Sequence, residues 1–150
     1  MNHATEAAAL VAFLGEYTGN PGLVLNANGH AAAEIEGVLF SFFYEADHNA
    51  LFIQAALGTP SPAALEPLML CNHLWEGTAG GIFGVNPEDG IVYYSYRLDF
   101  PLADEGIYPE FLCDLMGGIL GAIEVVMEEI FPEQQVQATM PTTLNPADAV

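Results

Sequence analysis

Basic side chains are almost missing from this sequence. Its 150 residues hold one arginine, Arg97, and no lysine against 20 aspartates and glutamates, so the formal net charge is −19 with histidine neutral. Nucleic-acid affinity rests largely on Lys and Arg groups that displace counterions from phosphates. Direct binding to DNA, RNA or an anionic membrane is therefore disfavoured, while solubility is favoured.

Cysteine is scarce too, and no segment has a targeting or membrane pattern. Cys71 and Cys113 lie far apart and match no metal or redox spacing, so we expect reduced, buried thiols. The first 17 residues lack the basic start of a signal peptide. The longest apolar run, residues 115–126, contains Glu124 and is too short to span a bilayer. The sequence predicts a soluble protein of the cytoplasm.

Apolar residues are abundant, at 52% of the chain, while only 14% of residues are charged. This composition supplies a core for one domain, which is the usual content of a chain of this length. We expect residues 1–132 to form that domain. Residues 133–150 show no hydrophobic period and include Pro141 and Pro146, so they predict a flexible C-terminal tail.

The first half of the chain predicts a helix and three strands. Residues 4–17 carry Leu10, Phe13, Leu14 and Tyr17 at offsets of three and four, which places them on one helical face. Residues 38–44 and 51–57 are β-rich runs separated by a turn at residues 47–49, which is typical of a hairpin. A turn signal at residues 26–29 predicts a further strand over residues 31–36.

The second half predicts a helix, two strands and a helix. Pro67 is disfavoured deep in a helix, so we expect the middle helix to start near Leu65 and to end near Glu76. Residues 82–85 and 91–98 predict a hairpin, and a helical stripe begins after Pro109 and stops before Pro132. The fold class is α+β, a twisted antiparallel sheet with three helices in the order α-β-β-β-α-β-β-α.

Two features of these helices indicate close neighbours. The middle helix is apolar around most of its circumference, which favours burial on two sides, by its own sheet and by a second copy of the chain. Gly117, Gly118 and Gly121 each cost the final helix roughly 1 kcal/mol relative to alanine. They favour tight packing of this helix on the sheet, or close approach of another element.

No motif for catalysis or metal binding is recognisable. The histidines show neither a helical zinc spacing nor a Cys-x-x-Cys setting, and no nucleophile motif surrounds the serines or cysteines. Paired acids such as Glu34 and Glu36 are expected on a solvated surface when acids are this frequent. We expect no enzyme activity and no cofactor. Arg97 falls in a predicted strand, where we expect it to pair with a carboxylate of the same chain.

Two segments between residues 68 and 98 stand in a specific order: Leu68-Met69-Leu70-Cys71-Asn72-His73-Leu74 and Phe83-Gly84-Val85-Asn86-Pro87-Glu88-Asp89-Gly90. Their order resembles the class I chaperones of type III secretion, the Tir chaperone family. In that family a Leu-rich helix bearing an Asn leads through glycines to a hairpin of the form Leu-Gly-Leu-Asp-x-x-x-Gly. Here Phe83 replaces the Leu and Asn86 replaces the Asp.

The resemblance implies a homodimer that binds the extended N-terminal segment of a secreted effector and keeps it secretion-competent without a cofactor. Chaperones of this kind are usually encoded beside their cargo. An effector segment could lie on apolar strand residues and add a strand at an exposed edge. We assign effector contact to Leu10, Leu14, Leu23, Leu25, Ile35, Val38, Phe40 and Phe42. We assign the dimer contact to Leu68, Cys71, Asn72, Trp75, Ile82, Val92 and Tyr94.

Two other classes of function stay open at this point. The charge of −19 alone would permit an acidic mimic of nucleic acid that inhibits a basic partner protein. Such binding would be sensitive to salt, whereas apolar effector binding would persist at about 0.5 M salt. An enzyme with an unfamiliar site would need a pocket with converging histidine or carboxylate groups.

Overall fold

The computed structural model describes residues 3–74, 78–102 and 108–130. The predicted α+β class and the order of elements are confirmed. The elements are α1 (Ala4–Tyr17), β1 (His30–Ile35), β2 (Val38–Glu45), β3 (Ala50–Gly58), α2 (Pro62–Leu74), β4 (Ile82–Val85), β5 (Val92–Asp99) and α3 (Phe111–Ile130).

The sheet has five antiparallel strands in the order β1-β2-β3-β5-β4, so β1 and β4 form its two edges. The turn between β1 and β2 is Glu36-Gly37, with φ angles of 50° and 81°. Positive φ at both positions is typical of the tight two-residue hairpin turn. The predicted first strand ran one residue too far, because the left-handed backbone at Glu36 ends it.

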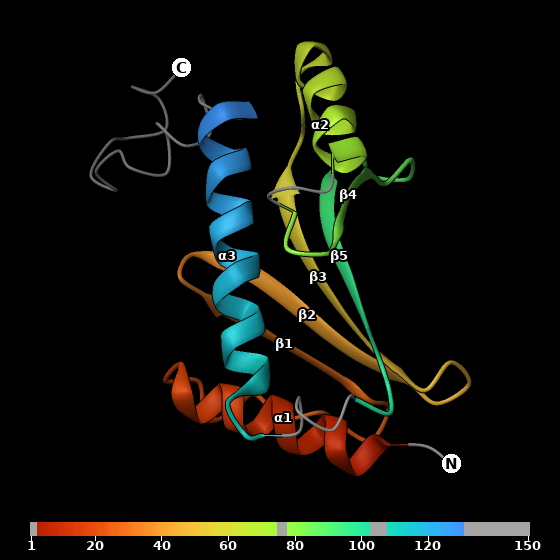
Figure 1. Ribbon diagram of the computed structural model, residues 1–150, viewed down its shortest axis with the longest axis vertical. Coiled ribbons are helices and arrows are strands. Elements are labelled where there is room, and N and C mark those ends of the chain that lie inside the picture. Colours follow the sequence, from red (N-terminus) through yellow and green to blue (C-terminus); the bar gives the residue numbers. More distant parts are fainter. Residues whose placement is uncertain (1–2, 75–77, 103–107, 131–150) are drawn as a thin grey trace.

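The helices cover one face of the sheet. α3 runs along that face and α1 crosses its lower end, while α2 lies beside β4 at the upper end (Figure 1). Phe40 and Phe42 of β2 point to the covered face and are fully buried, whereas Leu39 points away and is 55% exposed. The stripe that α3 buries against the sheet consists of Leu112, Met116, Ile119, Ile123 and Val126. On α1 the buried residues are Ala7, Leu10, Val11, Leu14 and Gly15, and Tyr17 is exposed.

The middle helix begins earlier than predicted. α2 starts at Pro62 and contains Pro67 in its interior. Proline suits the first position of a helix, where no N–H is needed. Pro67 removes the bond to the carbonyl of Ala63, but both residues are exposed, so water can reach that carbonyl. Trp75, the predicted helix end and the predicted tail of residues 133–150 lie outside the described residues.

The glycines of α3 do not pack on the sheet as predicted. All three are exposed. A Cβ added at Gly117 or Gly121 would have no described neighbour within 4 Å, and one added at Gly118 would lie 3.8 Å from Ala79 Cβ. These glycines therefore leave an open stripe of backbone on the outer side of α3. Within the described residues no helix is long and apolar enough to cross a membrane.

We expect Gly117→Ala to raise the free energy of unfolding by up to about 1 kcal/mol and the melting temperature by about 2–4 °C. The methyl group meets no atom, and alanine restricts the unfolded chain. Gly29→Ala is the opposite control, because Gly29 has a φ of 80° and its Cβ would lie 2.8 Å from the Tyr44 carbonyl oxygen. Calorimetry checks both. A lower melting temperature for Gly117→Ala would mean that a second chain touches this stripe.

Candidate partner-binding surfaces

The side chain of Asn72 covers the outer edge of β4. Its Nδ2 donates to the carbonyl oxygen of Phe83 at 2.6 Å, and the N–H of Phe83 donates to Asn72 Oδ1 at 2.8 Å. The backbone of Phe83 therefore bonds to α2 on its outward side, where a further strand would otherwise pair. This bridge ties α2 to the sheet and blocks strand pairing at the Phe83 position of this edge.

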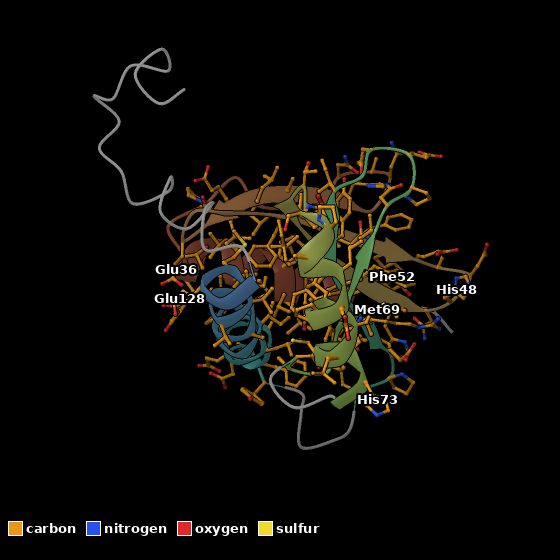
Figure 2. All side chains as sticks on the ribbon, turned by 90° about the horizontal axis from the view of Figure 1, so that it is seen from above. Glu36, His48, Phe52, Met69, His73 and Glu128 are labelled. Atoms are coloured by element: carbon orange, nitrogen blue, oxygen red, sulfur yellow. The ribbon has the colours of Figure 1, made fainter. Side chains whose placement is uncertain are left out.

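The outer side of α2 and β4 is apolar and nearly free of charge. Met69 is 72% exposed and Leu70 is 56% exposed, with Leu65 and Val85 also exposed nearby. A cavity of about 200 Å³ opens on this side, and it is lined by Leu65, Leu68, Met69, Asn72, Phe83, Gly84 and Val85. Figure 2 shows Met69 and His73 on α2. We call this surface the α2–β4 face.

The other sheet edge, β1, is open along its middle. Ile35 and Val38 flank the two-residue turn and are directly paired. The pair Ile35–Val38 that flanks such a turn is hydrogen-bonded, and hydrogen-bonded and non-hydrogen-bonded pairs then alternate along the strands. Ala32 and Glu34 fall on non-hydrogen-bonded positions, so they direct their N–H and C=O groups away from β2. Both residues are exposed, and no described strand pairs with them. They offer backbone hydrogen bonds to an incoming strand.

One end of this edge is closed by a turn. The N–H of His30 donates to Asn26 Oδ1 at 3.0 Å, and the N–H of Asn26 donates to the His30 carbonyl oxygen at 2.8 Å. Beside this turn a groove of about 540 Å³ runs between α1 and β2. Its lining residues are Ala4, Thr5, Ala8, Leu25, Asn26, Ala27, Asn28, Gly29, Phe43, Tyr44, Glu45 and Ala46.

The uncovered face of the sheet carries one continuous row of large side chains. His30 pairs with Phe43, Phe43 with Phe52, and Phe52 with Arg97 across four adjacent strands. The rings of the first two pairs stack, with centroids 4.3 and 6.4 Å apart, and the Arg97 guanidinium lies 5.6 Å from the Phe52 centroid. In Figure 2, Phe52 and His48 lie on the side of the molecule away from α3.

Arg97 pairs within the chain, as predicted. Its Nε donates to Asp99 Oδ1 at 2.7 Å, and the side chains of both residues are about half exposed or more. The charge of this pair is screened by water, so it contributes little to stability. The guanidinium is nevertheless held over Phe52, which fixes its position at the end of the aromatic row.

Ionisable groups with shifted pKa values serve structure. Burial raises the pKa of Tyr94, whose hydroxyl donates to the Thr78 carbonyl oxygen at 2.7 Å beneath β4. The hydrogen bond to Asp114 raises the pKa of the Tyr108 hydroxyl above its ordinary value. Burial, followed by the charges of Asp114 and Glu110, raises the pKa of the Cys113 thiol. A raised pKa lowers the fraction of the nucleophilic thiolate at neutral pH.

Most of the residues predicted to contact an effector are buried in the core of this chain. Leu10, Leu14, Leu23, Ile35, Phe40 and Phe42 are buried under the helices, and only Leu25 and Val38 are partly exposed. Large apolar residues of β2 point to both faces of the sheet, so the sequence left open which face the helices cover. The helices cover the face of Phe40 and Phe42, two of the residues that had been assigned to the effector. On β2 and β3 the large apolar side chains that face outward are Leu39, Phe43 and Phe52.

The residues predicted for the dimer contact are divided between core and surface. Leu68, Val92 and Tyr94 are buried within the chain. Cys71 and Asn72 are partly exposed on α2, and Ile82 is 59% exposed on β4. The exposed large apolar residues of α2 that sequence analysis left out of the dimer contact are Leu65, Met69 and Leu70. Once Leu68 is placed on the inward side of α2, the helical period of 3.6 residues directs Met69 and Leu70 away from the core.

The described residues bring no three His, Cys, Asp or Glu side chains together as a metal site. The α2–β4 face offers apolar contact, and the β1 edge offers backbone hydrogen bonds. This chemistry suits the binding of polypeptides.

Known proteins match this arrangement. The family model for the Tir chaperone protein (CesT) family matches residues 9–117. The solved ExsC-ExsE complex aligns with a TM-score of 0.69 at 17% identity, covering 87% of this chain and 97% of that chain. The HopA1-SchA chaperone-effector complex aligns with a TM-score of 0.65 at 16% identity, covering 83% and 95%. The ExoT-SpcS complex from Pseudomonas aeruginosa gives 0.58 at 16% identity, covering 83% and 98%.

At these identities the solved structures establish the fold alone. No curated protein sequence gives a significant match. The family model spans most of the chain, from α1 to the first half of α3, and includes both surfaces described above. The chain therefore belongs to the Tir chaperone protein (CesT) family, the chaperones of type III secretion.

Proposed function

We propose that this chain is a homodimeric chaperone that binds the N-terminal segment of a secreted effector and keeps it soluble and secretion-competent. The observation that supports the proposal is that a member of this family carries two separate surfaces, one apolar and one an open strand edge, whose chemistry suits polypeptide binding. The α2–β4 face receives a second copy of the chain. The β1 edge, at the far side of the same sheet, receives the effector segment.

Charge supports the choice of the α2–β4 face for self-association. Two copies that each carry a net charge of −19 repel one another, so they can meet only where carboxylates are few. α2 holds a single acid, Glu66, and β4 holds none. The exposed Leu65, Met69 and Val85 then lose water on contact, which provides the driving force.

The open edge of β1 supports binding of an extended segment. Strand addition binds the backbone of the incoming segment, so it can hold that segment in an extended conformation with little dependence on its sequence. The exposed Ala32 and Glu34 supply the bonds, and the partly exposed Leu25 and Phe43 line the groove beside the same strand. One solved structure of similar fold, HopA1-SchA, is itself a chaperone-effector complex.

The charge of the chain also favours the rival function of an acidic mimic that inhibits a basic partner. Light scattering separates the two, using the purified chain alone and with the first ~100 residues of the protein encoded beside it. A dimer of 16.0 kDa subunits that retains the fragment at about 0.5 M NaCl supports the chaperone, because screening then acts within a few Å. Retention only at low salt, or a monomer that ignores the fragment, favours the mimic.

We expect Ala32→Pro to weaken binding of the effector fragment by at least about tenfold while leaving the dimer intact. Proline removes one outward N–H from the edge, and each such bond contributes about 0.5–1.5 kcal/mol before steric exclusion by the ring is added. Isothermal titration calorimetry measures the change. Ala32→Ser, which keeps the N–H, should bind like the original chain. Equal binding by Ala32→Pro would move the effector to another surface.

A further inference from the structure

The open stretch of the β1 edge has a fixed limit at each end. At its first end, Asn26 takes both outward backbone groups of His30, through hydrogen bonds of 3.0 and 2.8 Å. At its other end, the left-handed backbone of the Glu36-Gly37 turn leads the chain back into β2. Between these limits the outward positions are Ala32 and Glu34. An incoming strand can therefore form backbone hydrogen bonds with β1 only at these two residues.

The turn that blocks His30 is held by several hydrogen bonds. Asn26 Oδ1 also accepts the N–H of Asn28 at 2.9 Å, and the Asn26 carbonyl oxygen accepts the N–H of Gly29 at 2.9 Å. The Gly29 carbonyl oxygen accepts the N–H of Tyr44 on β2 at 2.9 Å, so the turn is tied to the sheet. A strand that extended past Ala32 would have to break the bonds of Asn26 to His30, which is unfavourable. The turn therefore ends strand pairing at Ala32.

Glu34 is the charged member of the two pairing residues. Its side chain is exposed on the uncovered face of the sheet, where it pairs with Leu39 of β2. The only permanent cation of the chain, Arg97, is bound to Asp99 on β5, three strands away. An opposite charge directly across from a carboxylate on a neighbouring strand is favourable, and a like charge is unfavourable. A cation beside Glu34 on its outer side must therefore come from another molecule.

We propose that Asn26 and Glu34 together set the register of the incoming strand and select a lysine or arginine at one position of it. Every strand pair of this sheet is antiparallel. An antiparallel strand exchanges both backbone bonds with the residue directly opposite, so it pairs residue by residue with Glu34 and Ala32. The basic residue lies opposite Glu34, and the residue opposite Ala32 follows it by two positions.

The need for such a device follows from strand geometry. Side chains alternate between the two faces with a period of two, so a slip of two residues keeps every side chain on its own face. An apolar pattern alone does not exclude that slip, whereas a fixed end and a charged position do. This inference rests on the proposed function and adds a register and a sequence preference to it.

Charge reversal tests the selection of a basic residue, with the effector fragment described above as the probe. We expect Glu34→Lys to weaken fragment binding about tenfold in titration calorimetry, because an attraction is replaced by a repulsion. Glu16→Lys makes the same change of net charge at the exposed end of α1 and should bind like the original chain. Glutamate in place of one basic residue of the fragment, at a single position, should restore binding to Glu34→Lys. Equal binding by both lysine variants would overturn the selection.

Photo-crosslinking tests the register. The photoreactive amino acid p-benzoylphenylalanine replaces Ala32, which keeps the backbone N–H and the charge of Glu34. We expect cross-links to one site of the fragment, two positions after the basic residue identified by charge reversal. Asn26→Ala should spread the cross-links to sites two residues apart, because it frees the N–H of His30. Asn26→Asp, which keeps the acceptor oxygen, and Asn28→Ala in the same turn should both retain the single site.

The outcomes separate this inference from the proposed function. Cross-links that are spread equally in the original chain and in Asn26→Ala would refute the fixed register, while binding of the fragment would still support the chaperone. A fragment that does not bind the original chain at all would refute the proposed function itself.

Discussion

Asn72→Leu is expected to lower the free energy of unfolding by about 2–4 kcal/mol. The substitution removes both hydrogen bonds to the backbone of Phe83 and leaves its N–H and C=O facing an apolar side chain. Each unsatisfied group costs about 1–3 kcal/mol when it is shielded from water. A chain of this size has only about 5–15 kcal/mol to lose, so the variant stands close to unfolding. Urea denaturation followed by circular dichroism measures the difference.

The adjacent His73→Ala serves as the matched control, because His73 is exposed and its loss should change stability by less than about 0.5 kcal/mol. Asn72→Asp adds a sharper contrast. It keeps the acceptor for the Phe83 N–H but sets a carboxylate oxygen against the Phe83 carbonyl, so it should also be destabilised. Measurements at two protein concentrations separate the fold from dimer formation. Equal stability of Asn72→Leu and His73→Ala would contradict the bridge.

Met69→Glu should convert the proposed dimer to a monomer. Met69 is the most exposed apolar side chain of α2, and a symmetric contact would bring two copies of the new carboxylate into an apolar interface. Burying an unpaired charge costs several kcal/mol, so the dissociation constant should rise at least about 100-fold. Light-scattering mass should fall from twice 16.0 kDa to 16.0 kDa at micromolar concentration.

Leu39→Glu is the control for this change. Leu39 is also an exposed apolar residue, but it lies on the uncovered face of β2 next to the β1 edge. Its substitution adds the same charge to the chain and should leave the dimer mass unchanged. If Met69→Glu remains a dimer, the two copies meet elsewhere, and the open glycine stripe of α3 becomes the next candidate.

The fold was predictable because most elements have an unambiguous period. The stripe on α3 repeats every three or four residues, and the two hairpins alternate on either side of strong turn signals. The start of α2 was not predictable in the same way. Packing against β4 and the Asn72 bridge stabilise it, and both contacts lie outside the helix itself, so the periodicity of the helix does not reveal them.

The partner surfaces were less predictable, and β2 shows why. Phe40 and Phe42 alternate with Leu39 and Phe43, so either set could have faced the helices. The choice is decided by which side α1 and α3 cover, and that information does not lie in β2 itself. Whether the backbone groups of Ala32 point outward depends likewise on how many residues separate it from the Glu36-Gly37 turn. That count can be made only when the turn type is known.

The Asn72 bridge also bears on fibril formation. A chain that displays an open strand edge risks stacking edge to edge without limit, and unlimited growth requires two different edges that fit each other. Here Asn72 already occupies the outward side of β4, so an open β1 edge can find no matching β4 edge on the next molecule. The strand pairing left to identical chains is β1 with β1, which a bound effector strand would block. One asparagine thereby removes the head-to-tail pairing of β1 with β4.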